Sequence, residues 1–338
     1  MKKTIFITIF VLSTACSAFA AEVNLYTSRH YKSDTYLYKK FTDKTGIKVN
    51  VITSKYKVLE KRLLSEGKYS KADVVITADA GALGSATKKG LFQKVKSETL
   101  NSKIPANYRS AYWYGIAKRA RLIYYNPENI SSNIAKNLNY EDLANPMFKE
   151  RIVIRKSSNI YNQSLVSSLI NNNGLSKTSK WAKGLVSNMA RKPKGNDRAQ
   201  ILAVAAGEAD LAVANSYYIA LMLSGKKGPE QQAAAKKVQP IFPNQSNRGT
   251  HMNISGGGVA KYAPNKANAI KFLEFLLTVE AQEHIVNNSF EYPMIAGVQP
   301  NKLIAQFGTS FKQDNKTKVT SYYNNQKKAL TLMKKAGW

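Results

Sequence analysis

The sequence predicts an α/β protein built from two doubly wound lobes that are joined by two crossing strands. Short apolar runs typical of buried strands alternate with amphipathic helical segments along most of the chain. Two longer strand candidates, residues 113–126 and 249–260, contain glycine and lie where the chain would pass from one lobe to the other and back. Together these features predict a hinged clamp with its ligand in the cleft.

Residues 1–20 have the pattern of a cleaved secretory signal, with a basic start, an apolar stretch and a small-x-small ending at Ala18-Phe19-Ala20. We expect the mature chain to begin at Ala21 and to reside in the periplasm. No later segment approaches the roughly 18 to 20 apolar residues of a membrane span. The single cysteine, Cys16, lies inside the signal, so disulfides and thiolate metal sites are excluded from the mature chain.

The chain is strongly basic, with 51 Lys and Arg against 21 Asp and Glu in 338 residues, a net charge of +30. The lysines occur singly or in pairs and are not clustered with aromatic residues, so no nucleic-acid-binding module is predicted. We interpret the excess mostly as a bias of the surface. Attraction to anionic envelope lipids or to an acidic partner is left open.

The first lobe is expected to comprise residues 21–118 and 253–297. It begins with a strand at 22–28, where apolar and polar residues alternate, and this strand ends just before His30 and Tyr31. A helix capped by Ser33-Asp34 follows and stops at Gly46. Further elements are expected at 47–53 (strand), 58–65 (helix), 72–77 (strand), 265–277 (helix) and 280–287 (helix).

The second lobe is expected to comprise residues 119–252 and 298–338. Its strand at 211–214 feeds directly into a helix, because Asn215-Ser216 can cap the apolar run that follows. Tyr217 and Tyr218 therefore fall on the first turn of that helix. Other elements are expected at 140–143 (helix), 151–154 (strand), 164–170, 181–191 and 198–206 (helices), and 321–338 (a lysine-rich tail helix).

Three strand-to-helix turns carry oxygen or nitrogen ligands: His30-Tyr31, Tyr161 and Tyr217-Tyr218. Open α/β sheets bind ligands at the carboxyl ends of their strands, where helix N-termini favour anions. Four phenolates and an imidazole at one point would repel each other unless a hard, highly charged cation were present. Fe³⁺ fits this requirement, and its coordination would deprotonate phenols whose reference pKa is about 10.

Tyr217 and Tyr218 can also be explained as half-buried residues that cover a sheet edge. Two further adjacent pairs, Tyr124-Tyr125 and Tyr322-Tyr323, do not end a strand-to-helix turn and are interpreted as structural. Of the remaining histidines, His284 falls within a helical pattern, whereas His251 adjoins the second crossing and is a candidate for lining the cleft.

At these residues the sequence resembles the periplasmic ferric-iron-binding proteins of ABC importers, including the FutA branch. The matching strings are NLYTSRHY (24–31), SSNIYNQSL (157–165), WAKGLVSNMAR (181–191), GNDRAQ (195–200), ANSYY (214–218), FPNQSNRGTHMNISG (242–256) and EYPMIAG (291–297). The resemblance spans nearly the whole mature chain. It implies a class II periplasmic-binding-protein fold and Fe³⁺ held by His30, Tyr31, Tyr161, Tyr217 and Tyr218.

Other branches of that family use fewer tyrosines, an acidic ligand and a bound anion. Here Tyr31 and Tyr161 are both present and no carboxylate replaces them, which argues against an obligatory synergistic anion. Four phenolates around Fe³⁺ leave a charge of about −1, so arginines are useful counterions. Arg119, Arg121 and Arg198 are the candidates, and each of them can also be explained by an ordinary salt bridge.

The sequence therefore predicts a secreted, monomeric ferric-binding protein that delivers iron to an inner-membrane ABC permease with its ATPase. It shows no Gly-x-Ser-x-Gly or His-Glu-x-x-His motif, so an exported hydrolase is not favoured. A binding protein for a different solute, such as a polyamine or a phosphorylated compound, is the nearest competing hypothesis. A basic envelope protein that binds anionic surfaces is a further one.

Overall fold

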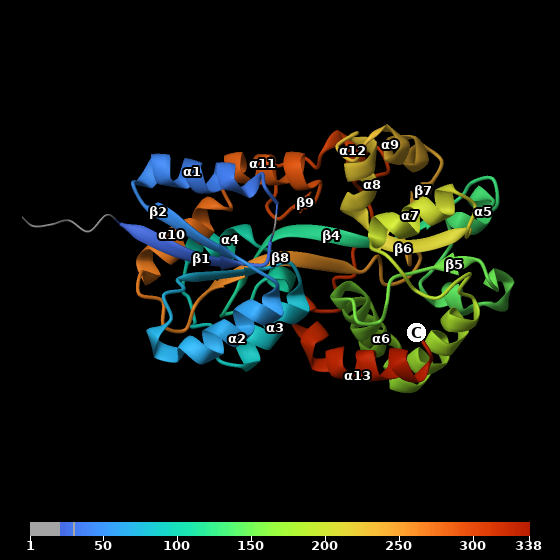
Figure 1. The fold of residues 1–338 in the computed structure, drawn as a ribbon, viewed down its shortest axis with the longest axis horizontal. Coiled ribbons are helices and arrows are strands. Elements are labelled where there is room, and N and C mark those ends of the chain that lie inside the picture. The colour runs from blue at the N-terminus through green and yellow to red at the C-terminus, as the bar shows by residue number, and fades with distance from the viewer. Residues whose placement is uncertain (1–20, 30) are drawn as a thin grey trace, which may run out of the picture.

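The computed structural model describes residues 21–29 and 31–338, so the predicted signal segment lies outside the described residues. Strands and helices alternate in this part as the sequence predicts (Figure 1). The strands are β1 (Glu22–Thr27), β2 (Lys48–Thr53), β3 (Val74–Thr77), β4 (Tyr114–Tyr125), β5 (Ile152–Val153), β6 (Leu211–Asn215), β7 (Gln239–Ile241), β8 (Met252–Val259) and β9 (Tyr292–Pro293).

The helices pack on both sides of the strands. They are α1 (Asp34–Thr45), α2 (Tyr56–Glu66), α3 (Ala80–Lys88), α4 (Glu98–Lys103), α5 (Ser132–Ala135), α6 (Ile160–Ser187), α7 (Asp197–Ala205), α8 (Ser216–Leu223), α9 (Pro229–Lys236), α10 (Lys266–Phe275), α11 (Val279–Ser289), α12 (Lys302–Ala305) and α13 (Tyr322–Lys335). Among the described residues, none of these helices is long and apolar enough to cross a membrane.

One sheet runs through both halves of the molecule, in the order β2-β1-β3-β8-β4-β6-β5, with β7 and β9 also paired to β4. Strand β1 is parallel to β2 and β3, whereas β8 is antiparallel to both β3 and β4. Strand β4 pairs with β8 as far as Ala120 and with β6 from Arg121 onward. The two predicted crossing strands are thus confirmed as β4 and β8, which lie side by side at the centre of Figure 1.

Each half of the sheet is covered on both faces. In Figure 1, α1 and α11 lie above the left half and α2 and α3 below it, while α7 and α8 lie above the right half and α6 and α13 below it. The buried apolar side chains form two clusters. One contains Leu25, Phe41 and Phe272 and extends along β4 to α7 and α8, and the other contains Phe148 and Trp181. This is the doubly wound arrangement that the alternating pattern predicts.

Some boundaries differ from expectation. Helix α6 begins at Ile160 rather than 164, because the Asn159 side chain accepts a hydrogen bond from the Tyr161 amide (3.1 Å) and caps the first turn. The expected helix at 181–191 is the second half of α6, beyond a kink at Gly174, where φ is 78°. Strand β3 is fully buried as predicted, but it is parallel only to β1 and antiparallel to β8.

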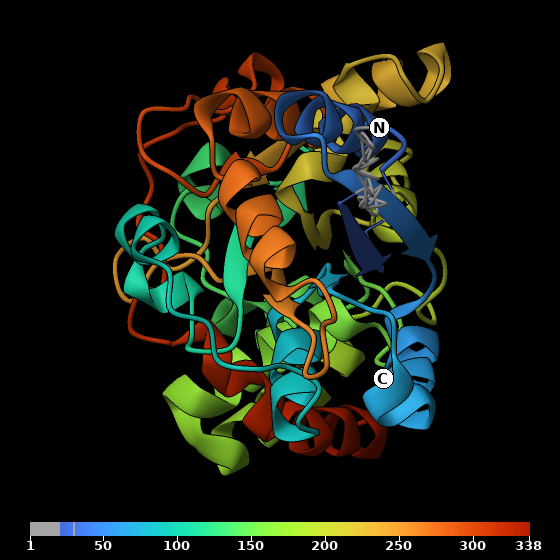
Figure 2. The ribbon, with the colours of Figure 1, turned by 90° about the vertical axis from the view of Figure 1, so that its left-hand side faces the viewer.

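The predicted lysine-rich tail forms α13, which lies along the bottom of the molecule beside α6 (Figure 2). Tyr322 at its start donates a hydrogen bond to the Met252 carbonyl of the crossing strand β8 (2.8 Å). Tyr323 packs against Gly84 of α3, where a Cβ would lie 2.5 Å from the tyrosine Cβ. The last helix therefore contacts elements of both halves of the sheet.

Candidate metal site

The three predicted turns meet in a cavity of about 430 Å³ between the two halves of the molecule. Tyr31 follows β1, Tyr161 lies in the first turn of α6, and Tyr217 and Tyr218 lie in the first turn of α8. All four tyrosines line this cleft. His30, the fifth predicted ligand, lies outside the described residues.

The Tyr217-Tyr218 turn is held by the crossing strand β4. Asn215 is the N-cap residue of α8, as predicted, but its side chain makes no capping hydrogen bond, because its Oδ1 accepts from Arg121 Nη1 (3.0 Å). Ser216 Oγ instead accepts from the Ala120 amide (3.3 Å). The two tyrosine rings lie 4.2 Å apart between centroids, at 33° to each other. Their orientation is thus tied to the strand that joins the two halves.

Arg121 also reaches the turn that carries Tyr161. Its Nη2 donates to Asn162 Oδ1 (2.8 Å) and its Nη1 to Asp197 Oδ2 (2.7 Å). Asn162 in turn donates to the Arg155 carbonyl (2.8 Å), at the start of the loop before α6. Arg121 does not line the cleft. It is a positioning residue that links the turns of α6 and α8.

Burial keeps three tyrosines of the cleft, Tyr31, Tyr217 and Tyr218, protonated. It raises the pKa of Tyr217 well above the usual value of 10, and the nearby phenols of Tyr161, Tyr218 and Tyr31 raise it further. Burial likewise raises the pKa of Tyr218 to about 12 and that of Tyr31 well above 10, the latter with the help of Glu291. A bound cation is therefore needed to deprotonate this group at neutral pH.

Two buried arginines lie against the tyrosine rings. The Arg29 guanidinium carbon is 4.5 Å from the centroid of Tyr31, and that of Arg119 is 5.2 Å from the centroid of Tyr161. Both arginines form an ion pair with Glu291, Arg119 through Nη1 and Oε1 at 3.1 Å. Burial raises the pKa of Glu291, but the two guanidinium groups outweigh this effect and hold it below its usual value.

The cleft itself is lined by basic side chains. Besides Arg29 and Arg119, these are Lys32, Arg198 and Lys227. Arg198, a predicted counterion, donates to Gln231 Oε1 (3.4 Å) at the edge of the cleft. No Asp or Glu is among the lining residues. Within the described chain, no group of three or more His, Cys, Asp and Glu could hold a metal ion, so the tyrosines are the donor set that this cleft offers.

The tyrosine pairs interpreted as structural have other partners. Tyr124 donates to the Asn215 carbonyl (3.1 Å), and Tyr322 donates to Met252 as described above. His284 contacts the Ser33 carbonyl through Nε2 (2.8 Å) and stacks on a tyrosine of α1.

His251 does not line the cleft. It is buried, and neither of its ring nitrogens has a partner among the described residues. Burial lowers its pKa to about 3, with help from Arg121, Arg248 and Arg119, so the ring is neutral near pH 7.

Residues 69–321 match the family of bacterial extracellular solute-binding proteins. The chain belongs to this family. The predicted two-lobe α/β fold is thereby confirmed, and the chain is a solute-binding protein rather than an enzyme.

Several relatives of this solute-binding protein cover almost its whole length. The iron uptake protein A1 of Synechocystis sp. is 49% identical over 324 residues, which is 94% of this chain and 87% of that protein. A structure of Trichodesmium FutA in complex with iron and citrate ligands has a TM-score of 0.90 and 52% identity, over 94% of this chain and 100% of that one. The ferric binding protein from Campylobacter jejuni has a TM-score of 0.86 and 42% identity, over 93% and 99%.

Sequence reasoning missed two residues of this solute-binding protein that contact the site, Arg29 and Glu291. They are 262 positions apart, and only the fold brings them together. Arg29 offered a weak signal, because it directly precedes His30 at the end of the first strand. Glu291 offered none beyond its place in the EYPMIAG string.

Proposed function

We propose that this protein captures Fe³⁺ in the cleft through Tyr31, Tyr161, Tyr217, Tyr218 and His30. The observation that carries the proposal is the convergence of four phenols from three separate turns on one cavity. Phenolate oxygens are hard, anionic ligands that suit a trivalent oxophilic ion. The relatives named as iron uptake and ferric binding proteins support this assignment.

The charges around the cleft support binding without an obligatory synergistic anion. Four phenolates around Fe³⁺ carry a net charge of about −1. Arg29 and Arg119 lie directly against two of the phenols, and their charges are shared with the buried carboxylates of Glu291 and Asp34. The other basic side chains that line the cleft, Lys32, Arg198 and Lys227, can offset the remaining negative charge, which lowers the cost of burying the loaded site.

We further propose that the lobes divide as residues 21–118 with 253–297 and residues 119–252 with 298–338. The change of partner of β4, from β8 to β6 after Ala120, supports a boundary near residue 118. Tyr161, Tyr217 and Tyr218 then belong to one lobe, and Tyr31 with His30 to the other. Iron bound to the tyrosine-rich lobe would favour closure by adding contacts that only the closed form makes.

We also propose that the protein acts as a periplasmic monomer and delivers its iron to an inner-membrane ABC permease and its ATPase. Membership in an extracellular solute-binding family supports this step. The predicted signal at 1–20 supports export.

A phosphorylated solute is a second candidate ligand, because five basic side chains and no carboxylate line the cleft. The same observation disfavours a polyamine, which would be repelled. The two candidates differ in their optical consequences, since only a ferric ion forms coloured phenolate complexes.

The test is a titration of metal-free protein with ferric citrate. We expect a visible phenolate-to-iron charge-transfer band that saturates at one equivalent and bleaches in acid, because protons compete for the phenolate oxygens. A phosphorylated sugar should neither produce the band nor block it. A protein that remains colourless at saturating ferric citrate would contradict the proposal.

A further inference from the structure

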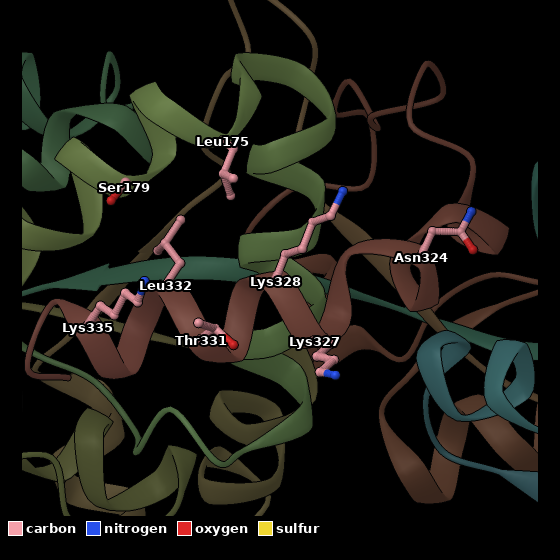
Figure 3. Close-up of a pocket in the computed structure, with 8 residues that line it drawn as sticks. All are labelled: Leu175, Ser179, Asn324, Lys327, Lys328, Thr331, Leu332 and Lys335. Atoms are coloured by element: carbon pink, nitrogen blue, oxygen red, sulfur yellow. The ribbon is translucent and has the colours of Figure 1, made fainter.

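A basic groove lies between α13 and the second half of α6, away from the cleft. Its volume is about 490 Å³, and Lys327, Lys328 and Lys335 line it together with Leu175. Figure 3 shows Lys328 and Leu332 rising from α13 toward Leu175 of α6. A shallower hollow adjoins it at Leu175 and adds Lys180 and Lys183.

The kink at Gly174 builds this surface. It separates the second half of α6 from the first, and the lysines of that half recur every three residues, on one side of the helix. The lysines of α13 recur at an interval of seven residues and also lie on one side of their helix. We call the resulting surface the lysine face: Lys177, Lys180, Lys183, Lys327, Lys328, Lys334 and Lys335, all of them exposed.

The charge of the lysine face is not compensated. Residues 171–187 and 315–338 contain no Asp or Glu. None of the seven lysines forms an ion pair within the part of the chain that the structure describes. Two carboxylates accept hydrogen bonds from asparagine side chains at the end of the first half of α6. They do not neutralise the lysines, because Glu141 pairs with Arg248 and Asp314 is buried against Thr317.

We propose that the lysine face docks the protein on anionic phospholipid headgroups. Seven lysines spread over two helices suit a fluid array of phosphates, whereas a defined carboxylate or phosphate site would favour the rigid fork of arginine. Leu175 is 50% exposed among the lysines, as on surfaces that rest at a membrane interface. Such docking would hold the protein close to the bilayer, and it does not depend on the identity of the cleft ligand.

The test is co-sedimentation of the mature protein with phosphatidylcholine vesicles, with and without phosphatidylglycerol. We expect binding only to the anionic vesicles and weaker binding at high salt. The triple variant K183E/K328E/K335E should lose binding by at least about tenfold. A matched control, K88E/K266E/K271E, reverses three exposed lysines of α3 and α10 that also lack ion pairs, and should lose much less.

Thermal unfolding of both variants establishes that they are folded. Equal losses in the two variants would show that the overall charge is responsible and would overturn the proposal. Binding to neutral vesicles that carry the permease, lost on reversal of the lysine face, would also overturn it, in favour of an acidic protein surface. The ferric titration of the same variants tests the cleft separately, because none of the substituted lysines lines it.

Discussion

Tyr217→Phe is expected to lower the affinity for Fe³⁺ by at least about a hundredfold, because one of several metal bonds that together supply more than about 10 kcal/mol is lost. The ring of Tyr217 is only 6% exposed, and the substitution keeps its packing against Tyr218. The free energy of unfolding of the metal-free protein should therefore hardly change. Competition with a ferric chelator measures the affinity, and thermal unfolding measures the stability.

Tyr322→Phe is the matched control. Its hydroxyl is buried and donates to the Met252 carbonyl, so its loss should cost about 1 kcal/mol of stability. It belongs to a pair that does not line the cleft, and iron affinity should be retained. The ligand assignment fails if Tyr217→Phe binds iron as tightly as the parent, or if Tyr322→Phe loses iron to the same extent.

Glu291→Gln is expected to destabilise the metal-free protein by about 3 kcal/mol, because it leaves the buried guanidinium group of Arg119 without an ion-pair partner and that of Arg29 with Asp34 alone. Arg29 and Arg119 are 5% and 2% exposed and Glu291 is fully buried, so water cannot replace the lost charge. In the iron-loaded protein the loss should be smaller, since the negative phenolate shell then faces both arginines. Chemical denaturation with and without iron measures both values.

Glu280→Gln is the control for this second substitution. Its side chain is partly exposed and pairs with Lys40 and Lys44 at the surface, where solvent screens the interaction. Stability should hardly change in either state. An equally small effect of Glu291→Gln would mean that the buried arginines do not need its charge, and an undiminished loss in the loaded protein would separate Glu291 from the iron site.

Local patterns were sufficient to predict the parts of the fold that they determine. The apolar run of β6 ends where a helical pattern begins, so the first-turn position of Tyr217 followed from the sequence. The length and glycines of β4 and β8 marked them as crossing strands. The same reasoning separated the cleft tyrosines from Tyr124 and Tyr322, which lie in a strand interior and at the start of the tail helix.

Contacts between distant segments could not be predicted. The side chain of the N-cap residue Asn215 accepts a hydrogen bond from Arg121 in place of a capping bond, and this contact depends on β4 lying beside β6. Glu291 meets Arg29 only because the chain returns to the first half of the sheet after β8. Charge balance at the site is therefore a property of the tertiary fold, whereas the tyrosines themselves are marked by local sequence.

The most direct test of the tyrosinate site is a crystal structure of the iron-loaded protein with anomalous diffraction measured at the iron edge. We predict a single strong peak in the cleft, within bonding distance of the phenolate oxygens of Tyr31, Tyr161, Tyr217 and Tyr218, and the same map will show whether His30 completes the shell. A peak elsewhere on the molecule, or one in the cleft that contacts neither Tyr217 nor Tyr218, would contradict the assignment.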